Sequence, residues 1–181
     1  GGQVFSMRLQ AGSVRNQYNV SFTDPEFLGY PIAFGFDVFN ESYRYTEDSD
    51  YREDTSGGQI RLGKMLSPFV TLKTSFRYSD ISYGDLGALW LYTREWRREF
   101  QDTTTISNSW SLERNTVDNN TNPGHGGKHE LVGTLAGFGG DNNFIRLEHS
   151  STWYWTLDEN DKWVLSYRTR EGWETEYGSS D

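Results

Sequence analysis

Alternating apolar and polar positions dominate the chain, and clusters of Gly, Asp, Asn and Pro separate the alternating segments. The clearest segment runs from Phe69 to about Tyr83, with Val70, Leu72 and Phe76 on one face and Thr, Lys, Ser and Arg side chains on the other. A period of two is typical of a β-strand with only one face in apolar surroundings. The pattern predicts about nine strands, divided by turn residues. They cover, approximately, residues 3–12, 17–23, 31–45, 56–64, 69–83, 103–115, 129–136, 143–156 and 162–173.

The direction of the two faces separates two kinds of β-protein. A soluble sandwich or barrel points its apolar face to a core, whereas an outer-membrane barrel points it to lipid and lines a wet lumen with polar residues. Here the polar faces mix small residues with both signs of charge, which favours a lumen of paired charges. The expected lumen-facing residues are Asp37, Arg61, Lys73, Arg77, Glu113, Arg146, Glu148, Arg168 and Arg170.

Aromatic residues gather where strands end. Such clusters are typical of an interfacial girdle, because an amphipathic ring fits the headgroup level of a bilayer. The expected girdle residues are Phe27, Tyr30, Trp153, Trp155 and Trp163. We therefore predict an all-β fold, an antiparallel transmembrane β-barrel segment in which residues 1–181 are part of one outer-membrane barrel domain.

Composition agrees with this class. Aromatics make up 16% of the residues, although the mean hydropathy is −0.77. A barrel combines the two properties because only every second strand residue meets lipid. The net charge of −9 argues against nucleic-acid binding, and the absence of Cys excludes disulfides and thiolate metal sites.

About nine strands cannot end in a bilayer as an open sheet, because the unpaired backbone groups of two edges would each cost several kcal/mol. The chain has no signal-peptide pattern, and both ends look like cuts. We therefore expect further strands, from the same parent or from a partner, to complete the barrel.

Four segments, in order, resemble the barrel of the BamA-type outer-membrane protein assembly factors. The first is Gln17–Phe27, a strand that ends in Asp24-Pro25, and the second is Gly57–Gly63 followed by Leu66-Ser67. The third, Thr116–His129, is similar to the family's "R-D-x-R…P-x-x-G-x-R" segment but has Asn115-Thr116-Val117-Asp118 at the start. The fourth is Trp163–Trp173, with its paired Arg and aromatic-Gly end. The resemblance covers essentially the whole chain.

This resemblance implies about nine strands of a larger, sixteen-stranded barrel in the bacterial outer membrane. It places 13–16, 46–55, 84–102 and 138–143 outside the cell, and the turns near 24–31, 65–69, 115–128 and 158–162 in the periplasm. It implies outer-membrane lipid and lipopolysaccharide, nascent β-barrel clients and accessory assembly lipoproteins as partners. The family's periplasmic domains, its first and last strands and its Arg-Gly-Phe loop are not present here, so none of its best-known functional residues can be transferred.

One segment breaks the strand pattern. Residues 86–100 are rich in Leu, Trp, Arg and Glu and lie between two strands, which predicts a short loop helix. Its aromatic residues Trp90, Tyr92 and Trp96 would cap the lumen or touch a partner; a plainly packed loop helix is the alternative.

Catalytic, cofactor and metal sites are not expected. His125 and His129 lie in a Gly-rich turn, and Gly124–Lys128 lacks the spacing of a phosphate loop. The acidic run Glu47–Asp54 lacks the EF-hand pattern, which leaves a solvated loop or weak divalent-ion bridging to lipopolysaccharide. For Glu113 and Glu148, ion pairs with Arg146, Arg168 and Arg170 are favoured over an acid/base pair.

The favoured function is therefore the barrel wall of the outer-membrane protein assembly machinery, which helps β-barrel proteins to fold and insert. The alternatives are a related barrel for protein translocation or secretion, and a porin-like channel. An outer-membrane hydrolase would need a clustered His/Ser or His/Asp set, and the sequence shows none.

Overall fold

The computed structural model describes residues 2–45, 51–84, 100–158 and 163–178 of the 181-residue chain. Nine strands account for most of them, and one short 3-10 helix, η1 (Phe27–Gly29), follows the second strand. The strands are β1 (Val4–Gln10), β2 (Arg15–Asp24), β3 (Ala33–Tyr45), β4 (Tyr51–Ser67), β5 (Val70–Gly84), β6 (Thr103–Asn115), β7 (Gly126–Ala136), β8 (Phe144–Thr156) and β9 (Val164–Glu176). In this part of the chain, no helix is long and apolar enough to cross a membrane.

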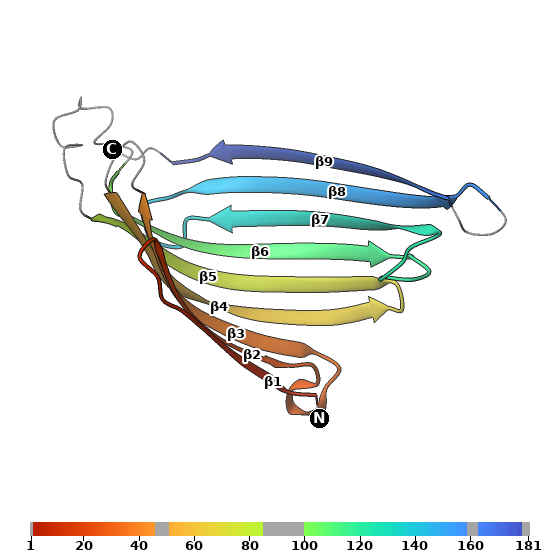
Figure 1. The fold of residues 1–181 in the computed structure, drawn as a ribbon, viewed down its shortest axis with the longest axis horizontal. Coiled ribbons are helices and arrows are strands. Elements are labelled where there is room, and N and C mark those ends of the chain that lie inside the picture. Colours follow the sequence, from red (N-terminus) through yellow and green to blue (C-terminus); the bar gives the residue numbers. More distant parts are fainter. Residues whose placement is uncertain (1, 46–50, 85–99, 159–162, 179–181) are drawn as a thin grey trace.

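All nine strands form one antiparallel sheet in the order β1 to β9, so each strand pairs with its neighbours in sequence (Figure 1). The sheet is strongly curved, and among the described residues β1 and β9 each pair on one side only. The meander puts the turns at 25–32, 68–69 and 116–125 at one end of the sheet, where Thr156 at the end of β8 also pairs with Val164 at the start of β9. The prediction of an all-β antiparallel barrel segment of about nine strands is confirmed.

The two faces of the sheet differ in composition throughout. Cross-strand partners point to the same side of a sheet, and the register joins Asp37 to Gln59 and then to Arg77. It likewise joins Lys73 to Ser111, Val132 and Glu148. Because residues two apart share a side, all nine charged residues expected in the lumen lie on one face, which we call the polar face.

The opposite face, called here the apolar face, is uncovered. Val38, Ile60 and Leu131 on this face are each more than half exposed, at 57%, 53% and 51%. Among the described residues, Ala136 is the one buried hydrophobic side chain. A soluble β-protein would hide this face in a core, whereas a membrane barrel presents it to lipid.

The strand boundaries lie within about three residues of the predicted ones, except at the start of β4. This strand starts at Tyr51, although its predicted start was Ser56. The added residues include Glu53 and Asp54, which lie on opposite faces of the strand, and Asp54 pairs with Arg52 (Nε–Oδ2 2.8 Å). The expected acidic loop is therefore partly strand, and the described residues hold no group of acidic or histidine side chains arranged for a metal ion.

Candidate functional site

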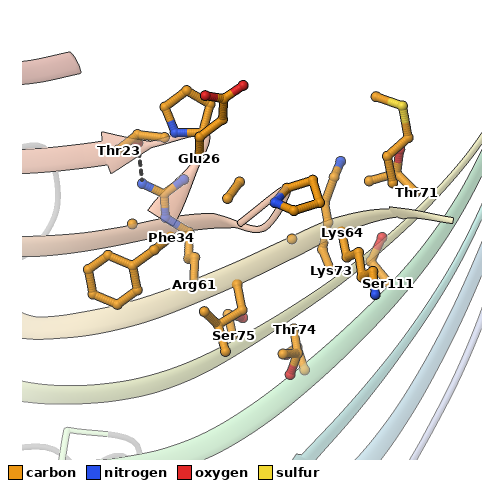
Figure 2. A pocket seen from close by; sticks show the side chains of 18 of the residues that line it. Thr23, Glu26, Phe34, Arg61, Lys64, Thr71, Lys73, Thr74, Ser75 and Ser111 are labelled. Atoms are coloured by element: carbon orange, nitrogen blue, oxygen red, sulfur yellow. Dashed lines mark hydrogen bonds between the residues drawn. The ribbon is translucent and has the colours of Figure 1, made fainter. Parts of the chain in front are cut away.

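The polar face lines a groove at the end of the sheet that carries the β2–β3 turn (Figure 2). The groove has a volume of about 750 Å³, and its wall extends from Thr23 on β2 to Val132 on β7. Residues of six successive strands face one space only if the sheet is concave on that side. The polar face is therefore the inner surface of the curved wall, and the apolar face is the outer surface.

Asp37 is the centre of the first charged cluster on this inner surface. It accepts hydrogen bonds from Gln59 Nε2 (2.7 Å) and Arg61 Nη2 (3.1 Å), and Arg61 Nη2 also lies 3.4 Å from Thr23 Oγ1. Arg61 Nε is 2.8 Å from Asp37 Oδ2 as an ion pair, although this buried nitrogen makes no directed hydrogen bond. The cluster joins β2, β3 and β4 side by side.

Glu113 is the centre of the second cluster. Its side chain is 16% exposed and receives Lys73 Nζ at 2.9 Å from β5 and Lys128 Nζ at 3.3 Å from β7. The Glu113 carboxylate thus forms ion pairs with two ammonium groups, one from each neighbouring strand. Hydroxyl contacts continue the pattern, with Ser111 Oγ donating to Glu130 (2.7 Å).

The remaining charges of the expected set find other partners. Arg146 forms an ion pair with Glu174 across β8 and β9, Arg168 Nε donates to Thr152 Oγ1 (3.3 Å), and Arg77 lies over the Phe39 ring at 4.7 Å. Glu148 and Arg170 have no hydrogen bond or ion pair within the part of the chain that the structure describes. The expectation that Arg146, Arg168 and Arg170 pair with Glu113 and Glu148 is therefore wrong. Register places Lys73 and Lys128 beside Glu113 instead.

Two of these ion-pair partners were not predicted from the sequence. Lys128 and Glu174 each stand just outside a predicted strand, the first before 129–136 and the second after 162–173. Continued alternation was the available signal, because both residues are in phase with their polar neighbours.

The expected girdle aromatics lie at the same end of the sheet as the groove. Phe27 stacks on Phe34 with ring centroids 4.6 Å apart, and Trp153 stacks on Tyr167 at 5.8 Å. Tyr30, Trp155 and Trp163 are exposed, at 65%, 45% and 67%. The loop-helix residues Trp90, Tyr92 and Trp96 lie outside the described residues.

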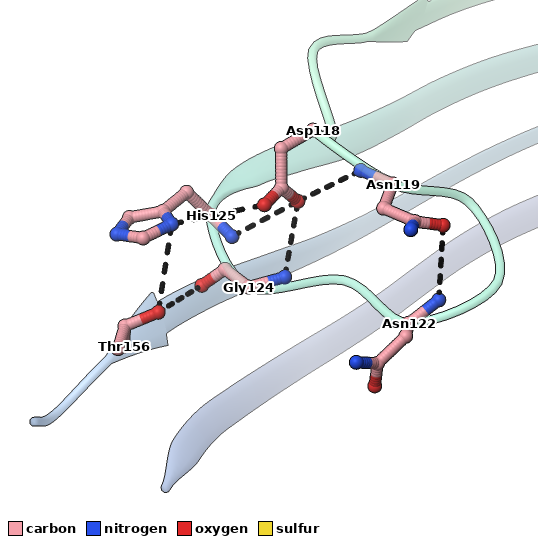
Figure 3. A network of polar contacts seen from close by, with 6 residues as sticks. All are labelled: Asp118, Asn119, Asn122, Gly124, His125 and Thr156. Carbon is pink, nitrogen blue, oxygen red and sulfur yellow. Dashed lines mark hydrogen bonds and ion pairs between the residues drawn. The ribbon is translucent and has the colours of Figure 1, made fainter. Parts of the chain in front are cut away.

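The β6–β7 turn at this end is a closed network (Figure 3). Asp118 Oδ1 accepts the backbone N–H groups of Asn119, Gly124 and His125 at 2.8, 3.0 and 3.1 Å. The turn also docks on β8, since Thr156 Oγ1 donates to the Gly124 carbonyl (3.1 Å). These bonds fix a Gly-rich turn that would otherwise have many conformations.

We expect Asp118 to control the order of this turn. The N–H groups of His125 and Gly124 hold the pKa of Asp118 below its usual range. A lowered pKa means that the charged form stabilises the folded turn, so protection is present above the ordinary carboxyl pKa and is lost as the pH falls through the lowered pKa. Hydrogen–deuterium exchange of the 116–127 peptide in the parent protein measures this loss. Asp118→Ala should raise the exchange at neutral pH.

Asp118→Asn is the matched control, because its amide oxygen still accepts N–H groups but does not titrate in this range. It should keep most of the protection and remove the dependence on pH. Unchanged exchange in Asp118→Ala would show that the backbone alone fixes the turn.

A third cluster contradicts the expectation that His and Ser residues do not come together. On the apolar face, His129 Nδ1 lies 2.8 Å from Ser151 Oγ, which lies 3.1 Å from His149 Nε2. Ser151 is 1% exposed, and its hydroxyl contacts both rings, so it is not open to a substrate. The arrangement does not fit an exposed nucleophile with its base.

Comparison with known proteins identifies the fold family. The Omp85 superfamily domain matches residues 1–181, the whole chain. The chain belongs to the Omp85 superfamily. Its structure is similar to the crystal structure of BamA from Haemophilus ducreyi lacking POTRA domains 1–3, with a TM-score of 0.79 and 17% sequence identity. The match covers 98% of this chain and 36% of that one.

Membership in the Omp85 superfamily accounts for the geometry. It identifies the chain as belonging to an outer-membrane β-barrel protein. Barrels of this class generally have an apolar outer face, which meets lipid, and a polar inner face, which lines the lumen. The predicted resemblance to the BamA-type barrel is confirmed by the family and by the shared fold.

Proposed function

We propose that this chain is barrel wall of an outer-membrane protein assembly factor, which helps other β-barrel proteins to fold and insert into the bacterial outer membrane. The observation that carries the proposal is the match of 98% of the chain to the BamA fold within the Omp85 superfamily. No covalent chemistry is involved. In this proposal, a client strand pairs with a strand edge of the parent barrel, which is a form of β-augmentation.

The polar face suggests what this wall contributes. Its ion pairs join neighbouring strands: Asp37–Arg61 spans β3 and β4, Glu113 with its two lysines spans β5 to β7, and Arg146–Glu174 spans β8 and β9. Such cross-strand pairs add to the backbone ladder and resist separation of the strands. A wall braced in this way keeps its shape while an edge elsewhere in the barrel opens for a client.

The proposed partners follow from the same role. Nascent β-barrel proteins would be the clients, lipid and lipopolysaccharide would surround the apolar face, and accessory lipoproteins would bind the periplasmic turns. The closed Asp118 turn offers these lipoproteins a surface of fixed shape at the expected periplasmic end.

Reconstitution tests the proposed role. The full-length parent protein is placed in liposomes, an unfolded outer-membrane barrel is added, and its folding is followed by the shift in gel mobility between unheated and boiled samples. We expect faster client folding than in empty liposomes or in liposomes that hold an unrelated barrel of similar size. No acceleration would make the assembly role wrong.

Depletion of the parent protein in cells separates the alternatives. An assembly factor should cause a general loss of folded outer-membrane barrels. Loss of one secreted protein, with other barrels intact, would indicate a translocation barrel instead. Steady ion conductance in planar bilayers without either effect would indicate a porin-like channel.

A further inference from the structure

The His129–Ser151–His149 cluster lies on the surface that faces lipid, next to the girdle residue Trp153, whose ring centroid is 5.2 Å from that of His129. On the apolar face of β8, Ile145 stands near one end and Trp155 near the other, about 33 Å apart along the strand at about 3.3 Å per residue. With a strand tilt of about 40°, this distance corresponds to about 25 Å along the bilayer normal, the height of the apolar band of a barrel. His149 and Ser151 lie between these residues.

Ionisable side chains at this depth are costly when they face lipid tails. The cluster also has ionisable neighbours on both sides. Arg114 on β6 is the cross-strand partner of His129, and Glu171 on β9 is the partner of His149. This part of the lipid-facing surface therefore groups four ionisable side chains around Ser151, whereas Leu, Val, Phe and Trp occupy many other positions of the apolar face.

The hydrogen-bond chain is unfinished at both ends. Ser151 has one proton, so it donates to one imidazole and accepts from the other. When both rings are neutral, the ring that accepts from Ser151 has an N–H at its second nitrogen, and the ring that donates to Ser151 has a lone pair there. Within the described part of the chain, neither second nitrogen, His129 Nε2 nor His149 Nδ1, is hydrogen-bonded, and neither is among the buried unsatisfied atoms. The chain thus presents one donor and one acceptor to its surroundings.

One donor and one acceptor on the same patch are complementary to a second copy of the patch. A two-fold axis brings the donor end of one chain to the acceptor end of the other and satisfies both, as an isologous interface requires. Leu131 and Leu147 border the cluster with 51% and 47% of their surfaces exposed, which provides apolar contact around the polar centre. Gly133, on the same face, leaves room for close approach.

We propose that the His129–Ser151–His149 cluster is the hydrogen-bonded centre of a lateral interface between two copies of this barrel in the outer membrane. The occupant of the patch is a second copy, because the patch complements itself. The proposal rests on the outer-membrane placement used in the proposed function, but not on assembly activity.

Cysteine cross-linking in native membranes tests the interface. Leu131→Cys is introduced into an otherwise cysteine-free full-length parent protein, and mild oxidation is followed by gel electrophoresis. Leu62→Cys on β4, with 43% of its side chain exposed on the same face, is the matched control. We expect a disulfide-linked dimer of the parent for Leu131→Cys and monomer for Leu62→Cys. Ser151→Ala, which breaks the hydrogen-bond chain, should lower the cross-linked fraction about fivefold.

Each other outcome overturns the interface. These are no dimer for Leu131→Cys, equal dimer for both cysteines, an unchanged fraction in Ser151→Ala, and a link to a protein of different mass, which would make the partner another barrel. If Ser151→Ala does not fold by the heat-shift criterion, His149→Phe replaces it. A monomer that still accelerates client folding contradicts only the interface, and a dimer without acceleration contradicts only the assembly role.

Discussion

Replacing Gly57 by alanine is expected to cost the folded barrel about 3 kcal/mol, or to prevent folding, because overpacking against fixed backbone is not relieved by side-chain movement. A Cβ at Gly57 would lie 2.2 Å from the Tyr78 carbonyl oxygen, 3.0 Å from Ser79 Cα and 2.9 Å from Phe39 Cζ. Two of these three atoms belong to the backbone of β5, which pairs with β4 on this side. Glycine is necessary here because there is no space for a Cβ atom, and not because the backbone dihedral angles require it.

The neighbourhood of Gly57 explains the close approach. Phe39 lies over the position where a side chain would stand, and the Arg77 guanidinium covers the Phe39 ring at 4.7 Å. Glycine in a strand allows a sharp local bend, and an aromatic ring from the next strand shields the exposed backbone. At Gly57, the absence of a side chain lets the backbone of β5 and the Phe39 ring approach β4 closely.

Gly63→Ala is the control in the same strand. Its added Cβ would have no neighbour closer than 3.7 Å, which is ordinary contact, so the change should stay within about 0.5 kcal/mol. Urea unfolding of the parent protein in lipid, followed by the heat-shift assay, gives both values. Equal stability of the two variants would show that β4 and β5 move apart at little cost and that the close approach at Gly57 does not require glycine.

The alternation of residues predicts most of the fold because lipid and lumen impose opposite chemistry on alternate positions. The alternation carries less information where that contrast ends. At 51–55, Glu53 and Asp54 continue β4 although neither face is apolar. The register with β3 and β5 holds this part of the strand, through pairs such as Glu53 with Tyr43 and with Tyr83. Pairing across strands is a property of the sheet, and the local sequence does not reveal it.

The contacts in the candidate sites also depend on the register between strands, which the local sequence does not reveal. Alternation assigns Glu113 to the polar face, but its two lysines follow only from the register of β5, β6 and β7. The histidine–serine cluster depends on one pairing, His129 with Ser151. A local signal for it did exist, since His149 and Ser151 are polar residues two apart on a face that is otherwise apolar.

Glu113→Gln is expected to destabilise the barrel by about 2 kcal/mol, because hydrogen bonds to charged groups contribute about 1.5–3 kcal/mol and two lysines lose their counter-charge together. The glutamine keeps the shape of the side chain, so the loss reports charge and not packing. The carboxylate is 16% exposed, which limits screening by water, whereas both lysine side chains are 50% exposed and retain part of their hydration. This partial hydration keeps the expected loss below that of a fully buried pair.

Glu41→Gln is the matched control for the same chemical change. Glu41 pairs with Arg15 across β2 and β3, where the two side chains are 36% and 44% exposed, so its loss should stay below about 1 kcal/mol. Unfolding of both variants in low and high salt separates the two cases, since salt screens exposed pairs more strongly than partly buried ones. A Glu113→Gln variant no less stable than Glu41→Gln would mean that Lys73 and Lys128 are solvated independently. The strands β5 to β7 would then be held by their backbone ladder alone, and the braced wall would have to be dropped from the proposed function.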